Sequence, residues 1–537
     1  MADRPKMGVE VNMRSDSSST KPASLSTPST NAVQTQADSP FCIAVMGDFS
    51  GRTHQPDLTT NDTKRRLIEV DRDNFDEVMA KFKINLPLDL STEENTPNKT
   101  SQTEIIQVSL NELDDFHPDE LYEKLESFEK LRSLRRRLKN NKSFAEAAAE
   151  VQSWLPAEET IENTRATSNQ ATSSPTPSSP AASAEPVTDN LLDSILGSSQ
   201  SQSHAAVETT QIDKLIKSIV APYVESAADP RQNDMLDMLD RATESHMQRI
   251  LHHPSFQALE SAWQSLYFLI KRIETGAKLK IFILDISKQE LQQDLSADDL
   301  SSSSIYKLFC DTSEGDTPLS VLLGNYTFSD NIEDALSLAN MGSIAQQANA
   351  PFIAAAHEKL AGCEAFSKSA DYEDWNYTAS EGATKAWALL RQSAVASYIA
   401  LALPRFLLRL PYGSKSKPID AFKFEEMTEE NRHGDYLWGN PAFIKTECLA
   451  QSFKSNGWNM QICELIQTDN LPVHYYSDEG ETVSKPIAEI MLTEKGGEIL
   501  NQHGLISLWS VRNADCIRSA DYHAIHANQQ QLAGRWR

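Results

Sequence analysis

A few short patterns in the sequence bring together residue types that bind phosphate or metal ions. The stretch 47–53 (GDFSGRT) follows an apolar run, as a phosphate-binding loop does, but it lacks the GxxxxGK[ST] spacing and its lysine. We interpret it as a turn that ends a strand. His252 and His253 are adjacent, and neighbouring side chains on a helix point about 100° apart, so the pair does not readily share one metal ion. We interpret these histidines as a helix boundary, and 311–316 (DTSEGD) as a turn, because it lacks the spacing and the final glutamate of a calcium loop.

The sequence also lacks other patterns that mark enzymes. It contains no GxGxxG, GxSxG or HExxH motif. The cysteines form no CxxC pair, and we expect them to be reduced, buried thiols. They are Cys42, Cys310, Cys363, Cys448, Cys463 and Cys516. We therefore assign no catalytic, cofactor-binding or metal-binding residue and expect no cofactor, with an enzyme on this scaffold as a remote alternative.

The composition excludes several classes of partner. The chain has 537 residues, with 50 lysines and arginines against 76 aspartates and glutamates, which gives a formal net charge of −26. Nucleic acids and anionic lipids both require a basic surface, so we expect neither as a partner. The sequence has no apolar run of about 18 residues and no apolar segment of a secretory signal near its start. We predict a cytoplasmic protein that does not insert into membranes.

Two polar tracts divide the chain into modules. Residues 1–40 are rich in Ser, Thr and Pro and too poor in apolar groups to offset the entropy of ordering, so we expect them to be disordered. Residues 156–210 have a similar composition and are interpreted as a linker. The tracts leave a small module at 41–155 and a large module at 211–537.

The small module reads as strands followed by a helix with an apolar stripe. Apolar runs predict strands over 41–46, 67–71 and 103–110. The segment 114–140 predicts one long helix, with acidic residues at its start and a basic cluster at its end that suits the helix dipole. The apolar residues of its stripe are spaced three or four apart and form a candidate contact between the modules. They are Leu121, Leu125, Phe128, Leu131, Leu134 and Leu138.

The large module alternates strand and helix patterns. Strands are predicted over 279–286, 318–326 and 351–356, with a helix over 332–348. A single helix is predicted over 386–403, ended by Pro404. Such alternation is typical of an α/β fold. An aromatic and aliphatic stripe at helical spacing is interpreted as core and comprises Phe256, Leu259, Trp263, Leu266 and Ile270.

A short apolar island interrupts the linker at 191–196 (LLDSIL). Its four large apolar residues share one helical face and are Leu191, Leu192, Ile195 and Leu196. This pattern predicts a short helix, which either docks on its own module or is recognised by a partner.

Longer strings in both modules resemble the contractile sheath of type VI secretion systems. The small module resembles TssB, the small sheath subunit, in IAVMGDFSGR, LIEVDRDNFDEVMAKFK and LNELDDFHPDEL. The large module resembles TssC, the large sheath subunit, in ILHHPSFQALESAWQSLYFLIKRIETG, LKIFILDISKQEL, APFIAAA, LALPRFLLRLPYG, YLWGNPAF and GLISLW. The chain therefore looks like a TssB–TssC fusion. The resemblance implies an α/β fold in which the two modules pack as one unit similar to a phage tail-sheath protein.

The resemblance also implies partners. Sheath subunits polymerise around a tube of Hcp, are linked by strand exchange, and drive the tube outward when they contract. TssC proteins carry a helix near their N-terminus that the AAA+ unfoldase ClpV recognises, and the island 191–196 matches it in sequence and position. We expect other sheath subunits, from TssB, TssC or copies of this chain, as partners, with Hcp, the baseplate and ClpV as further candidates.

One departure from the family leaves two roles open. The sequence ends at 532–537 (LAGRWR), where TssC proteins continue with a helix that contacts the tube and an arm that links neighbours. On this basis an accessory role, as a cap or a baseplate-linked component, is slightly favoured over that of a bulk sheath protomer.

Overall fold

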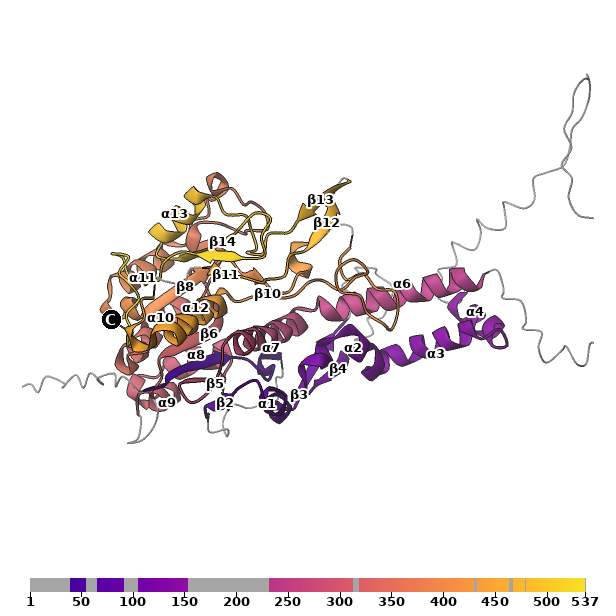
Figure 1. The fold of residues 1–537 in the computed structure, drawn as a ribbon, viewed down its shortest axis with the longest axis horizontal. Coiled ribbons are helices and arrows are strands. Elements are labelled where there is room, and N and C mark those ends of the chain that lie inside the picture. The colour runs from indigo at the N-terminus through magenta and orange to yellow at the C-terminus, as the bar shows by residue number, and fades with distance from the viewer. Residues whose placement is uncertain are drawn as a thin grey trace, which may run out of the picture.

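The structure is a computed structural model that describes residues 39–54, 65–90, 105–152, 231–311, 318–428, 432–462, 467–478 and 480–536. These residues form a mixed α/β body from which an arm of helices extends (Figure 1). The segment predicted to be disordered (1–40) lies almost wholly outside the described residues, as does the predicted turn at 311–316. The linker at 156–210 and its island at 191–196 lie wholly outside them.

A nine-stranded sheet forms the centre of the body, in the order β11-β15-β14-β8-β7-β6-β1-β5-β2. The strands from β14 to β5 are mutually parallel, and β2 and β15 run antiparallel to their neighbours. These strands are β1 (Phe41–Gly47), β2 (Ile68–Val70), β5 (Leu279–Asp285), β6 (Val321–Phe328), β7 (Phe352–Ala356), β8 (Ile399–Leu403), β11 (Gln467–Thr468), β14 (Ile506–Ser510) and β15 (Ile517–Ser519).

Three two-stranded sheets accompany it. They pair β3 (Ile84–Asp89) with β4 (Ile105–Leu110), β9 (Phe406–Leu407) with β10 (Trp438–Gly439), and β12 (Tyr475–Asp478) with β13 (Glu481–Ser484).

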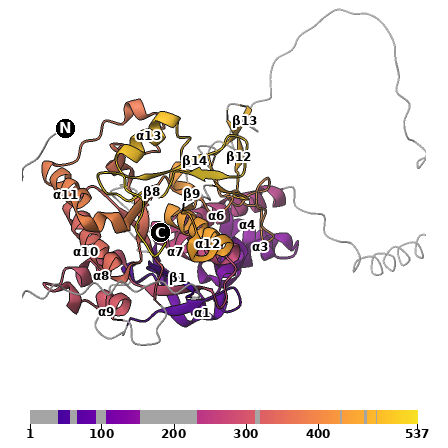
Figure 2. The same ribbon diagram turned by 60° about the vertical axis from the view of Figure 1, so that its left-hand side comes forward.

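Helices cover both faces of the large sheet, which explains why its central strands are continuous apolar runs. Side chains of a strand alternate between the faces. In β1, Ile43 and Val45 face the layer that contains α7, α12 and α1, whereas Ala44 and Met46 face the layer that contains α8, α9, α10 and α13 (Figure 2). The helices of the body are α1 (Phe75–Phe82), α2 (Pro118–Lys124), α7 (Pro254–Arg272), α8 (Lys288–Leu295), α9 (Ser304–Cys310), α10 (Ile332–Ala348), α11 (Glu381–Gln392), α12 (Pro441–Asn456) and α13 (Glu494–Gln502).

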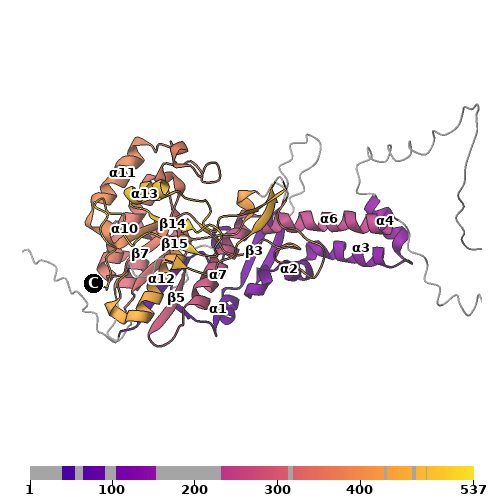
Figure 3. The ribbon, with the colours of Figure 1, turned by 45° about the horizontal axis from the view of Figure 1, so that its top comes forward.

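Described helices of both modules build the arm (Figure 3). They are α3 (Glu129–Lys139), α4 (Phe144–Gln152) and α6 (Gln232–Leu251). The arm has a small core of its own, separate from the two cores that flank the sheet. This core contains Leu134, Leu138, Phe144, Ala147, Ala148, Val151, Met235 and Leu239.

The structure confirms the predicted α/β fold in which the two modules pack as one unit. The prediction of one helix over 114–140 was wrong. A 3₁₀ turn (Leu113–Phe116) comes first, and α2 begins at Pro118, because proline is favoured at the first position of a helix. The extended backbone of Leu125 then ends α2, and a second 3₁₀ turn leads into α3.

The prediction of one helix over 386–403 was also wrong. The helix α11 ends at Gln392, where Ser393 adopts an extended backbone. A 3₁₀ segment (Ala394–Tyr398) then leads into β8, whose five residues are all buried between β7 and β14. A short apolar run fits a buried helix and a buried strand equally well, and here the pairing with two neighbouring strands decides between them.

Candidate functional site

The strand β1 of the small module lies in the middle of the large module's sheet. All seven of its residues pair with β5, from Phe41 opposite Leu279 to Gly47 opposite Asp285. On its other side, β1 pairs with β6 over Ile43–Met46. The small module therefore completes the sheet of the large module. This seam between β1 and its two neighbours is the candidate functional site, because its contacts hold the two modules together.

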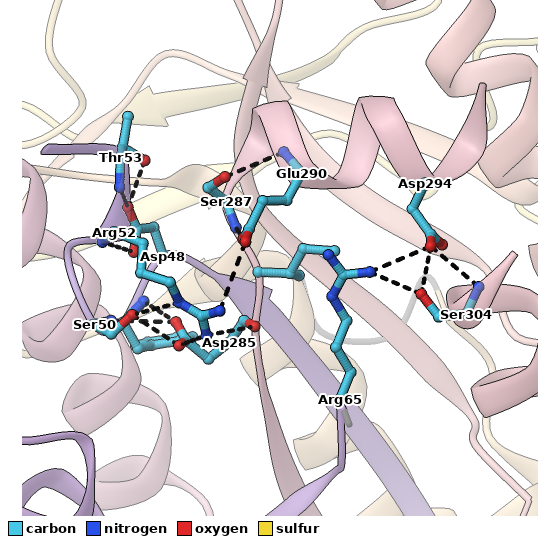
Figure 4. A network of polar contacts seen from close by, with 12 residues as sticks. Asp48, Ser50, Arg52, Thr53, Arg65, Asp285, Ser287, Glu290, Asp294 and Ser304 are labelled. Carbon is cyan, nitrogen blue, oxygen red and sulfur yellow. Dashed lines mark hydrogen bonds and ion pairs between the residues drawn. The ribbon is translucent and has the colours of Figure 1, made fainter. Parts of the chain in front are cut away.

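An ion pair secures the seam at the carboxyl end of β1 (Figure 4). Arg52 forms a short contact with Asp285, the last residue of β5, and its other guanidinium nitrogen lies 3.6 Å from Glu290. Asp285 also accepts hydrogen bonds from the backbone nitrogens of Phe49 (2.9 Å) and Ser50 (3.2 Å). Burial alone would lower the pKa of Arg52, but the neighbouring Asp285 outweighs burial and raises it. Burial also raises the pKa of Asp285, although Arg52 and Ser50 oppose this shift. The contact ties the turn after β1 to the large module.

The same turn is closed by its own side chains. Asp48 accepts hydrogen bonds at 2.9 Å from the backbone nitrogens of both Arg52 and Thr53. This is the strand-ending turn predicted for 47–53. Sequence reasoning missed the partnership with Asp285, although a carboxylate at the end of a buried apolar strand is a signal that it has a specific partner.

A second ionic link lies beside the first (Figure 4). Arg65 of the small module lies 3.2 Å from Asp294 of α8 and donates to the hydroxyl of Ser304 at 2.7 Å. Asp294 also accepts from the backbone nitrogens of Ser304 (3.1 Å) and Ile305 (3.0 Å), which begin α9. The acidic side chain thus caps α9 and binds the small module at the same time.

An aromatic cluster around Trp263 joins the modules beneath the sheet. Trp263, on α7, is fully buried, and its indole nitrogen donates to the carbonyl oxygen of Phe49 at 2.9 Å. Three phenylalanines of the small module pack against its ring, with centroids 5.3 Å (Phe49), 5.7 Å (Phe75) and 5.5 Å (Phe82) away. Sequence reasoning predicted Trp263 as core, and the structure shows that this core is shared between the modules.

The modules also meet where the loop 409–426 crosses α2 and α3. Asp119 accepts hydrogen bonds from the backbone nitrogens of Asp420 (3.2 Å) and Ala421 (2.9 Å). Arg135 donates to the carbonyl oxygen of Ala421 at 2.7 Å and to Asp240 of α6 at 3.1 Å. Backbone groups of the loop are thus satisfied by side chains of the small module.

A buried ionic cluster supports this loop from within the large module. Arg409 lies 2.6 Å from Glu260 of α7 and 2.8 Å from Glu426; both glutamate side chains are buried, and that of Arg409 is nearly so. Burial alone would lower the pKa of Arg409, but the two carboxylates raise it well above its usual value. A charge buried among partners in this way fixes one geometry, so the cluster orients the loop towards the small module.

The apolar stripe predicted on 114–140 is divided between two cores. Leu121, Leu125 and Phe128 belong to the core that contains α7, whereas Leu134 and Leu138 belong to the core of the arm. Leu131 is partly buried and packs against both cores. The residues 191–196 of the other predicted site lie outside the described residues.

Two features of the described residues bear on metal ions and ligands: the adjacent histidines and a cavity beside α7. His252 and His253 lie at the boundary between α6 and α7, as predicted. In the described ranges, no group of three or more histidine, cysteine, aspartate or glutamate side chains is arranged to hold a metal ion. A cavity of about 370 Å³ opens beside α7, but its charged lining residue, Arg405, is already bound to Glu489. No helix in the described part of the chain is long and apolar enough to cross a bilayer.

Comparison with known proteins identifies both sides of the seam. A family model described as EvpB/VC_A0108, tail sheath N-terminal domain, matches residues 233–524, which is more than half of the chain. The chain belongs to this tail sheath family. A second model, described as type VI secretion system VipA, VC_A0107 or Hcp2, matches residues 26–171.

Two curated relatives from Pseudomonas aeruginosa match the same two regions. The type VI secretion system sheath protein TssC1 is 32% identical over 287 residues, which cover 52% of this chain and 58% of TssC1. The sheath protein TssB1 is 30% identical over 105 residues, which cover 19% of this chain and 55% of TssB1. The chain thus spans less than two thirds of either relative. The tail sheath family member described here combines a TssB-like and a TssC-like part, and its seam joins the two.

Proposed function

We propose that this chain is a structural component of a type VI secretion sheath, in which the TssB-like and TssC-like parts form one protomer from a single polypeptide. The observation that supports this most strongly is the position of β1, which is hydrogen-bonded to β5 on one side and to β6 on the other. We assign residues 41–155 to the small part and 211–537 to the large part. Because β1 of the small part pairs with β5 and β6 of the large part, the two parts share one sheet and form one structural unit.

A single chain has a physical advantage over two separate subunits. The covalent connection raises the effective concentration of one part for the other, and it fixes a ratio of one to one. A chain whose two parts are already paired presents one complete unit to its neighbours.

Within this function, we propose an accessory position at an end of the sheath, as a cap or a baseplate-linked component. Support comes from the edges of the large sheet, where β2 has three residues and β11 has two. Short edge strands are poor templates for the addition of further strands. The resemblance to sheath subunits implies that neighbours are linked by strand exchange, which needs such templates. The alternative is a bulk protomer that assembles around the Hcp tube.

Electron microscopy of the purified chain, alone and mixed with separate TssB and TssC from the same source, tests both roles. Density at the ends of sheaths in the mixture, with only discrete particles from the chain alone, is the result expected for an accessory component. Long tubes from the chain alone would identify a bulk protomer. Discrete particles that never associate with a sheath would refute the proposed function.

We also propose that ClpV recognises the segment 191–196. The support is its sequence, because Leu191, Leu192, Ile195 and Leu196 form one apolar face in the position expected for the recognition helix. Peptide recognition by an amphipathic helix in a groove needs such a face.

A further inference from the structure

The hairpin of β12 and β13 projects from the body and carries charges of one sign. Asp478 lies directly opposite Glu481 in the register of the hairpin, and both side chains are exposed. Like charges in directly opposite positions destabilise a strand pair. In the described part of the chain, neither carboxylate forms an ion pair. A two-stranded hairpin with this arrangement lacks the cation that would stabilise it.

The helix α3 presents cations that lack a partner. Three of its arginines hold the arm together: Arg132 binds the carbonyl oxygen of Tyr122, Arg135 binds Asp240, and Arg137 binds Glu150. By contrast, Arg136 and Lys139 are exposed, and neither forms an ion pair with any described residue. They make a basic face on a chain whose net charge is −26.

The two features lie on opposite sides of the molecule. In Figures 1 and 2, the hairpin lies above α6, and α3 lies below it. The carboxylates and the cations of one chain therefore do not meet each other, although their charges are complementary.

We propose that the hairpin β12–β13 of one copy docks on the basic face of α3 of a second copy. This inference rests on the proposed function, because it assigns the contact between neighbouring copies in a sheath-type assembly. The guanidinium of Arg136 supplies the missing cation between Asp478 and Glu481, and a guanidinium presents its donors as a fork that suits carboxylates.

Such a contact repeats from copy to copy. Each chain has one hairpin and one α3, so the interface is heterologous, and it closes into a ring or continues as a helical array, depending on the rotation between copies. Both outcomes suit a sheath component, as an end ring or as part of the lattice. Because the contact is made between exposed charges, it weakens as salt is added.

Charge reversal tests the contact in the full chain. One variant carries Asp478→Lys and Glu481→Lys, a second carries Arg136→Glu and Lys139→Glu, and a third carries all four changes. The matched control for the second variant is Lys368→Glu with Lys385→Glu, two exposed lysines in the body. Sedimentation velocity and electron microscopy measure association, for each chain alone and with separate sheath subunits, and circular dichroism checks the fold.

We expect each of the first two variants to associate at least about tenfold more weakly than wild type, because reversed charges repel where the original charges attract. The third variant, with all four substitutions, should recover association, and the control should behave as wild type. If wild type associates and the first two variants associate equally well, the proposed contact is wrong and the proposed function stands. The same conclusion follows if the third variant is folded but does not recover association. If wild type neither self-associates nor joins a sheath, both are wrong.

Discussion

Replacement of Trp263 by alanine should separate the two parts of the chain. The indole is fully buried, bonds to the backbone of Phe49, and packs against three rings that come from the small part. Removal of the side chain leaves a cavity between the parts and an unsatisfied carbonyl oxygen.

The expected cost follows from this geometry. A buried tryptophan replaced by alanine costs about 3–5 kcal/mol, which combines lost burial with the cavity left behind. Trp263→Phe keeps an aromatic ring and loses mainly the hydrogen bond, so we expect about 1–2 kcal/mol for it. A loss of about 4 kcal/mol corresponds to a roughly thousandfold weaker association of the two parts.

The assay uses a protease site inserted into the stretch 156–190. After cleavage, size-exclusion chromatography and titration calorimetry measure whether the two fragments remain associated. Trp387→Ala is the matched control, because this tryptophan lies on α11, is only partly buried, and packs against the core on the other face of the sheet. We expect wild type and the control to remain associated after cleavage, and Trp263→Ala to dissociate.

The expected, roughly thousandfold loss of association can be tested against two contrary results. If cleaved Trp263→Ala binds within about tenfold of wild type, the aromatic cluster does not hold the parts together. If the control dissociates as readily as Trp263→Ala, the loss reflects general instability of the large part, and the assignment of the seam fails.

Three further predictions concern other sites. Arg52→Ala leaves Asp285 buried without its cation and should lower the free energy of unfolding by about 3–5 kcal/mol, measured by urea denaturation; a change below about 1 kcal/mol would show that the backbone donors suffice. Burial alone would raise the pKa of Glu489, but His433 and Arg405 outweigh burial and lower it to about 2. A carboxylate whose pKa is lowered in the folded state stabilises the fold at pH values above its ordinary pKa, and this contribution disappears as pH falls. Glu489→Gln should therefore reduce the loss of thermal stability between about pH 5 and pH 2. An unchanged dependence of thermal stability on pH in this range would contradict the prediction. Leu192→Asp with Ile195→Asp should abolish binding of ClpV in a pull-down, whereas retained binding would remove the segment 191–196 as its recognition site.

Several elements followed from the sequence because their signals are local. The helix α10 occupies the predicted residues, since the side chain of Asn331 caps its start and the left-handed backbone of Asn349 ends it. The strands β1, β5 and β7 were predicted from continuous apolar runs, as suits strands covered on both faces. The resemblance of both modules to sheath subunits also depended on local strings of residues.

Other elements depended on neighbours that are far away in the sequence. The run Ile399–Leu403 is as apolar as the helix before it, and only its pairing with β7 and β14 makes it a strand. The segment 114–140 has helical spacing throughout, yet its apolar residues serve two different cores, and the chain bends at Leu125 to reach both.

By itself, the sequence determined the fold class, most of the strands and the family of each module, because these depend on composition, periodicity and strings of adjacent residues. Only the tertiary structure decided that β1 enters the large sheet between β5 and β6, that Arg52 meets Asp285, and that Trp263 is shared by both parts. These contacts join residues that are more than 200 positions apart. No local pattern encodes such pairings, because they arise when separate apolar faces are buried together and the charges at their margins find partners.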